Sequence, residues 1–126
     1  MHRLVRAANA AAWVAEEEGT LAGFAIVEWL RDGGRFFAYL QTIEVAPAYR
    51  GRGMARELLR CAESSAWNAG AASLWLHVDA ENRPAIRLYQ SAGYLCRGSE
   101  DNYYGRGRAA LIYSKSLGPS QPSPAG

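Results

Sequence analysis

The chain has 126 residues, a length that suits one domain with a modest core. Hydrophobic residues make up 49% of it and the formal net charge is only +2, which excludes a charge-rich disordered chain and a strongly basic protein that coats nucleic acid. No apolar run approaches the roughly 18 residues of a membrane span. We therefore expect a cytoplasmic protein with no membrane or nucleic-acid partner.

The two cysteines, Cys61 and Cys96, lie far apart and lack the spacing of a metal or redox motif. We expect no metal site. Cys61 falls on the apolar side of a predicted helix, which favours a buried free thiol.

The first part of the chain predicts one short helix and three strands. Residues 2–11 are rich in alanine and favour the helix. Residues 13–18 and 21–30 predict two strands joined by a turn at Gly19, and a longer strand follows over residues 36–45 after the turn at Gly33 and Gly34.

A proline-marked, glycine-rich turn leads from that third strand into a predicted helix that starts after Gly53 and stops at Gly70. Gly51 and Gly53 remove side chains from the turn, and the first amides of the helix have no acceptor within it. Together with the charges of Arg50 and Arg52, such a turn attracts phosphate oxygens. Many strand-to-helix turns look like this without any ligand, so the turn alone leaves both interpretations open.

The second half alternates strands and helices. Residues 74–78 predict a strand, Asn82 and Pro84 open a helix that Gly93 closes, and residues 94–97 and 109–116 predict the last two strands. Residues 118–126 are rich in Pro, Ser and Gly and predict a disordered tail, so the domain is expected over residues 1–117. The mixture of hairpins and strand–helix–strand units predicts an α/β (α+β) fold.

Two motifs in this order resemble the GCN5-related N-acetyltransferase (GNAT) family, whose co-substrate is acetyl-CoA. The first is Arg50-x-x-Gly53-x-Ala55, which is similar to the family's pyrophosphate loop. The second is Asn82-x-x-Ala85-x-x-x-Tyr89-x-x-x-Gly93-Tyr94. The resemblance covers about residues 13–117 and implies a mixed, mostly antiparallel central sheet with flanking helices, in which two strands splay apart.

The resemblance also implies how acetyl-CoA is bound. Ile43 and Val45 would pair their backbones with the pantetheine arm, and the Val45 N–H would polarise the thioester carbonyl, an interaction that can contribute ~3 kcal/mol. Asn82 would contact the coenzyme, although a plain helix cap explains it equally well. The pyrophosphate would bind backbone amides of the turn: Arg50, Gly51, Arg52, Gly53, Met54 and Ala55.

Tyr89 matches the family position whose hydroxyl meets the coenzyme sulfur. A phenol is protonated at neutral pH, so it can donate a proton to a leaving thiolate as a general acid. The alternative is an aromatic side chain on the buried face of a helix.

On the acceptor side, the chain is most similar to the ribosomal-protein and protein N-terminal acetyltransferases. This resemblance implies that His77 acts as a base through water, that Tyr39 orients it, and that Tyr103 and Tyr104 bind the substrate in a closing hairpin. His77 could instead simply fill the sheet face. Glu44 is a reserve base, because regular strand alternation points it away from Tyr39, Ile43 and Val45 unless a bulge intervenes.

The chain departs from the family pattern before Trp13, where members carry a first strand and a pair of helices that wall the acceptor site. We expect that wall to be missing or reduced, or to be filled by another subunit of a homodimer. The sequence thus predicts an acetyl-CoA-dependent N-acetyltransferase whose acceptor is a protein or peptide N-terminal amine. The alternatives are a small-molecule amine as acceptor, or a truncated coenzyme-binding module without turnover.

Overall fold

A computed structural model describes residues 1–118, and most of the predicted tail over residues 118–126 lies outside the described residues. The described part forms one seven-stranded sheet in the order β1-β2-β3-β4-β5-β7-β6, with two α-helices. All neighbouring strands are antiparallel except β4 and β5. The elements are β1 (His2–Ala7), β2 (Ala10–Glu17), β3 (Thr20–Asp32), β4 (Arg35–Val45), η1 (Pro47–Tyr49), α1 (Met54–Asn68), β5 (Ser73–Asp79), α2 (Arg83–Ser91), β6 (Leu95–Glu100) and β7 (Ala110–Ser116).

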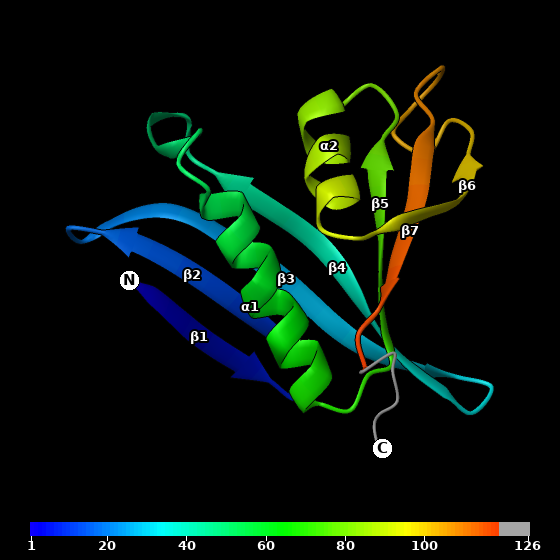
Figure 1. The fold of residues 1–126 in the computed structure, drawn as a ribbon, viewed down its shortest axis with the longest axis horizontal. Helices are drawn as coiled ribbons and strands as arrows, with labels where there is room; N and C mark the ends of the chain where they lie inside the picture. The colour runs from blue at the N-terminus through cyan, green and yellow to red at the C-terminus, as the bar shows by residue number, and fades with distance from the viewer. Residues whose placement is uncertain (119–126) are drawn as a thin grey trace.

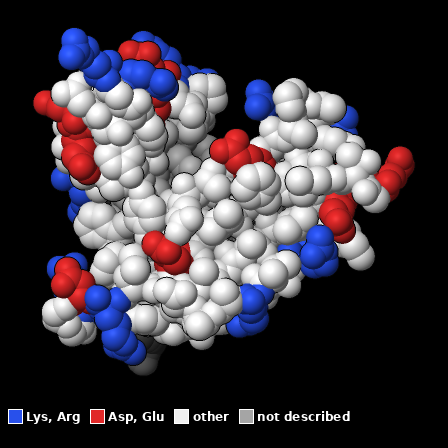
Figure 2. Space-filling model, turned by 180° about the vertical axis from the view of Figure 1, so that it is seen from behind, with Lys and Arg blue, Asp and Glu red and all other residues white. Residues whose placement is uncertain are grey.

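The core lies between the sheet and its two helices. Helix α1 crosses β2, β3 and β4, whereas α2 lies beside β5 (Figure 1). Leu58 and Leu59 of α1 are fully buried against Leu74 and Leu76 of β5, and Tyr89 of α2 belongs to the same cluster. Residues 1–118 place no helix on the opposite face of the sheet. Figure 2 shows that face to be mostly uncharged, with a few acidic groups among the uncharged side chains and a notch between two lobes.

The helix predicted over residues 2–11 is wrong. These residues form β1 and the start of β2, joined by a turn at Ala8 and Asn9. Alanine's helix propensity is a weak preference, and here pairing within the sheet overrides it, because Leu4 lies opposite Trp13 and packs against the core. A first strand is therefore present, whereas the described residues hold no helix between β1 and β2.

The predicted splay of two central strands arises at β4. This strand pairs with β5 only from Ala38 to Leu40, and its pairing with β3 then shifts by one residue, so that Gln41 forms a bulge. A bulge bends a strand and increases its twist. Beyond Gln41, β4 and β5 separate and the β4 edge is left without a partner strand.

Within the described residues, neither helix is both long and apolar enough to cross a membrane.

Candidate active site

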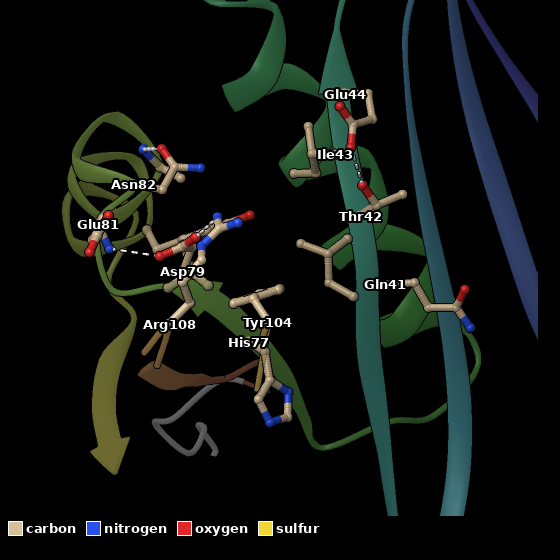
Figure 3. A pocket seen from close by; sticks show the side chains of 14 residues that line it. Gln41, Thr42, Ile43, Glu44, His77, Asp79, Glu81, Asn82, Tyr104 and Arg108 are labelled. Carbon is tan, nitrogen blue, oxygen red and sulfur yellow. Dashed lines mark hydrogen bonds and ion pairs between the residues drawn. The ribbon is translucent and has the colours of Figure 1, made fainter. Parts of the chain in front are cut away.

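A cleft of about 610 Å³ lies between β4 and β5, where the two strands separate. Figure 3 shows Thr42, Ile43 and Glu44 on the β4 side, with His77, Asp79 and Asn82 across from them. Tyr89 of α2 and Tyr104 and Arg108 of the β6–β7 loop also line the cleft. Three predicted regions, the strand before the glycine turn, the strand before Asn82 and the aromatic hairpin, thus meet around one cavity.

The end of β4 turns backbone groups away from β3, and of these the Val45 carbonyl accepts a hydrogen bond from Arg50 Nε. The Glu44 carbonyl faces β3, since it lies 2.7 Å from where a Cβ of Gly23 would stand, and Ala46 N donates to Ala22 O at 2.8 Å. Successive residues of a strand turn their backbone groups to opposite edges, so those of Ile43 and Val45 face the open edge. This is the arrangement expected for them, and their pairing with a coenzyme stays a prediction.

Because of the bulge, Glu44 lies on the same face of the sheet as Tyr39, whereas regular alternation predicted opposite faces. Tyr39 lies opposite Glu28 and Glu44 opposite Phe24, and these two β3 residues share one face because they are four apart. Tyr39 and Glu44 therefore share the helix-free face, while Ile43 and Val45 pack against the core. Glu44 also accepts a hydrogen bond from Thr42 Oγ1 at 2.8 Å, as Figure 3 shows.

The glycine turn and the start of α1 line a second hollow of about 400 Å³, and the Arg50 amide of this turn already donates to the Pro47 carbonyl at 3.3 Å. Gly51 and Gly53 have φ near +80°, and Gly53 caps α1 without any side-chain hydrogen bond. Met54 and Ala55 line the same hollow. An uncapped helix start of this kind suits an anion.

The side chains of the two arginines in the turn take different positions. Arg50 lines this second hollow and donates from Nε to the Val45 carbonyl at 3.0 Å. Arg52 does not line it and lies over the Tyr49 ring at 5.3 Å. Two arginines that sequence reasoning missed, Arg56 of α1 and Arg87 of α2, line the hollow instead. Arg56 stands in the first turn of α1, next to the glycine turn in sequence, and this closeness was the available signal.

Tyr89 is 7% exposed, and its side chain reaches the cleft from α2. Burial, followed by the nearby Tyr104 and Glu44, raises the pKa of Tyr89 to about 12. The hydroxyl therefore keeps its proton at neutral pH, which is the state a general acid needs. Its catalytic role remains a prediction.

The structure brings Tyr39 and His77 together. The Tyr39 hydroxyl lies 2.7 Å from His77 Nδ1. On the other side of the ring, His77 Nε2 lies 2.8 Å from an oxygen of Glu100, which is not among the predicted catalytic residues. The ring of Tyr103 stacks on His77, with the ring centres 4.3 Å apart and the planes within 4°. Both nitrogens and one face of the imidazole thus have a defined neighbour.

The β6–β7 loop that carries the two tyrosines is fastened to the end of β5. Arg108 forms an ion pair with Asp79, and Asn102 accepts a hydrogen bond from the Gly107 amide at 2.7 Å. The Glu81 amide and then Arg108 lower the pKa of Asp79, so this carboxylate stays ionised and holds the loop. Tyr104 is thereby kept at the mouth of the cleft.

Asn82 has the cap role that the sequence allowed. Its side-chain oxygen accepts from Ala85 N at 3.2 Å at the start of α2. The same side chain lines the cleft, so a coenzyme contact remains a prediction alongside the cap.

Comparison with known proteins identifies the family. The model of the Acetyltransferase (GNAT) family matches residues 2–94. The chain belongs to this family. Streptothricin acetyltransferase of Streptomyces lavendulae is 40% identical over 87 residues, which is 69% of this chain and 45% of that protein. The [Ribosomal protein bS18]-alanine N-acetyltransferase of Escherichia coli K12 is 36% identical over 88 residues, 70% of this chain and 57% of that protein.

The GNAT fold is also shown by solved structures. The crystal structure of the ribosomal-protein-S18-alanine N-acetyltransferase from Escherichia coli aligns with a TM-score of 0.79 and 29% identity over 96% of this chain and 76% of that one. The chain spans about half the length of the first two curated relatives that it matches.

Proposed function

We propose that this GNAT chain transfers the acetyl group of acetyl-CoA to a protein or peptide N-terminal amine. The observation that carries the proposal is the hydrogen-bonded pair Tyr39–His77, which lies beside the cleft under the stacked Tyr103. An imidazole held this way can take a proton from an incoming amine.

The coenzyme side of the cleft fits the proposal. Acetyl-CoA would supply the acetyl group as an activated thioester. The free edge at Ile43 and Val45 offers one N–H toward a thioester carbonyl, and the uncapped amides after Gly53 suit a pyrophosphate. Arg50, Arg56 and Arg87 add positive charge around those amides.

Proton transfer on the acceptor side suits an α-amine. With a pKa of ~8, an α-amino group is about one-tenth neutral at pH 7, whereas a lysine with a pKa of ~10.4 is neutral in well under a hundredth of molecules. A modest base such as His77 is then sufficient, with Tyr39 orienting it. Tyr89 keeps its proton for the departing thiolate because burial raises its pKa to about 12.

A hollow of about 300 Å³ beside this pair offers room for the first side chain of a peptide. Phe37, Trp75 and Ile112 line it together with Tyr39 and His77. It lies on the helix-free face, so a peptide chain can approach without passing through an enclosed pocket. This supports a peptide rather than a free small amine.

A second candidate acceptor is a small cationic amine. Glu28 and Glu44 share the helix-free face with Tyr39 and would attract positive charge. The relative from Streptomyces lavendulae is named for streptothricin, which favours the same candidate.

The deciding experiment is a thiol-release assay with acetyl-CoA and matched acceptors. We expect faster release with short peptides that carry a free, apolar first residue than with the same peptides blocked at the N-terminus or with polycationic small amines. The reverse order would replace the peptide acceptor by the small amine. Acetyl-CoA binding without release for any amine would indicate a coenzyme-binding module and contradict the proposal.

The assembly and location are further proposals. We place residues 1–117 in one domain in the cytoplasm, and the uncovered face of the sheet leaves room for a second copy in a homodimer.

A further inference from the structure

Glu100 reaches His77 across an intervening strand. It ends β6 and pairs with Ala110 of β7, while His77 lies on β5, on the other side of β7. The small, fully buried Ala110 leaves the path across β7 open, and the Glu100 carboxylate comes within 2.8 Å of His77 Nε2. The histidine side chain is 19% exposed and the glutamate 55%, so the contact lies at the edge of the site.

The partners of the imidazole define where its proton sits. A neutral imidazole has one N–H donor and one bare acceptor nitrogen, and a carboxylate only accepts. The Nε2 that faces Glu100 must therefore carry the hydrogen, which leaves Nδ1 bare toward the Tyr39 hydroxyl. Tyr39 can fill the donor role because burial and the neighbouring Tyr103 raise its pKa, so the phenol remains protonated.

Stacking alone does not produce this state. The Tyr103 ring fixes the plane of the imidazole, but a ring stacked on its face offers neither nitrogen an acceptor within that plane. Tyr39 can donate to or accept from the ring. Among the described neighbours, only the Glu100 carboxylate accepts a hydrogen bond without being able to donate one.

We propose that Glu100 is a positioning residue that holds the His77 proton on Nε2, so that the Nδ1 lone pair faces Tyr39 and, through its hydroxyl, the incoming amine. This rests on the proposed acetyl transfer. As the amine nitrogen bonds to the acetyl carbon, it passes one proton to the Tyr39 oxygen, and the original hydroxyl proton moves to Nδ1. The resulting imidazolium keeps its Nε2 hydrogen on Glu100, whose negative charge stabilises it.

The tautomer can be measured without any turnover. The chain contains two histidines, His2 and His77, so two-bond ¹H–¹⁵N spectra of ¹⁵N-histidine-labelled protein give two sets of signals, which the His2→Asn variant assigns. We expect neutral His77 to be protonated on Nε2 in the unmodified chain. In Glu100→Gln, the amide both donates and accepts, so we expect a mixture of the two tautomers.

Steady-state kinetics of the same variants test whether the His77 tautomer affects the rate of acetyl transfer. Glu100→Gln should lower kcat by roughly tenfold, part of the 10²–10⁴-fold that a positioned base contributes, with the KM for acetyl-CoA unchanged. Asp101→Asn makes the same carboxylate-to-amide change one residue later and should alter neither measurement.

An Nδ1-protonated His77 in the unmodified chain, an unchanged tautomer in Glu100→Gln, or an unchanged kcat despite a changed tautomer would each overturn the proposal. If the tautomer depends on Glu100 but the unmodified chain acetylates no amine, the proposed function fails while the assignment of the proton stands.

Discussion

At the scale of single residues, Tyr89 shows how burial prepares a side chain for one step of a reaction. The phenol is almost enclosed, and its pKa of about 12 means that the hydroxyl does not lose its proton to solvent at neutral pH. The protonated hydroxyl lines the cleft, where it can donate to a thiolate that forms next to it. The raised pKa keeps the proton on Tyr89 until a stronger base, such as the departing thiolate, forms beside it.

Replacing Tyr89 tests that role directly. Tyr89→Phe should lower kcat by ~10²-fold while the affinity for acetyl-CoA changes little, because the ring is kept and only the proton donor is lost. The measurement is steady-state thiol release together with calorimetric binding of acetyl-CoA. Tyr113→Phe, a change at another buried tyrosine that does not line the cleft, is the matched control and should retain kcat. Turnover of Tyr89→Phe equal to that of the control would remove the assignment.

A site residue could be predicted where it belongs to a short contiguous motif, and not where its role depends on a contact between distant segments. Tyr89, Asn82 and the turn from Arg50 to Ala55 stand in contiguous motifs, so the resemblance to the family could single them out. The structure places Tyr89 and Asn82 at the cleft and most of the turn at the second hollow. Glu100 could not be assigned, because its contact with His77 crosses β7 and depends on the small side chain of Ala110. Arg87 is missed for a similar reason, since its place at the α1 turn depends on how α2 packs.

At the scale of elements, β4 organises the site through its bulge and its open edge. The single extra residue Gln41 turns Glu44 toward the face of Tyr39 and ends the pairing with β5. Regular alternation predicted the opposite relation of those two side chains, and a bulge leaves no clear mark in a sequence of this kind. The length and position of the strand were predictable, but its register was not.

Gly23 of β3 allows β4 to lie close beside it because glycine has no side chain. A Cβ there would stand 2.7 Å from the Glu44 carbonyl and 3.3 Å from side-chain atoms of Leu58 and Met54. Gly23→Ala should therefore push β4 outward, lower the free energy of unfolding by about 1–3 kcal/mol and weaken acetyl-CoA binding. Urea unfolding and calorimetry measure the two effects.

The control for that change is Thr20→Ala, at an exposed position of the same strand, which should stay within about 0.5 kcal/mol of the unmodified chain. An equally small effect of Gly23→Ala would mean that β4 is not held by this contact.

At the scale of the whole molecule, two helices cover one face of a seven-stranded sheet, and residues 1–118 leave the other face without a helix (Figures 1 and 2). The sequence of elements and the α+β class follow from the alternation of turns and periodic segments, which is strong after residue 13. The error lies before it, where alanines favour a helix but Leu4 and Val5 pair across the sheet edge with Trp13 and Ala12. Long-range pairing decides such segments, and local propensity does not report it.

The open face and the cleft together imply two directions of approach. The coenzyme would enter from the side of the α1 start, and the amine from the helix-free face, where His77 lines both the cleft and the apolar hollow. His77 would then stand at the meeting point of the two substrates. The arrangement requires that the amides of the turn and of the β4 edge bind the coenzyme.

A ¹H–¹⁵N amide titration with acetyl-CoA tests that requirement most directly. We expect the largest shifts at the amides of Ile43 and Val45 and of the turn from Arg50 to Ala55, with saturation at one molecule per chain. Unchanged spectra, or shifts confined to residues away from the β4 edge and the start of α1, would contradict the account.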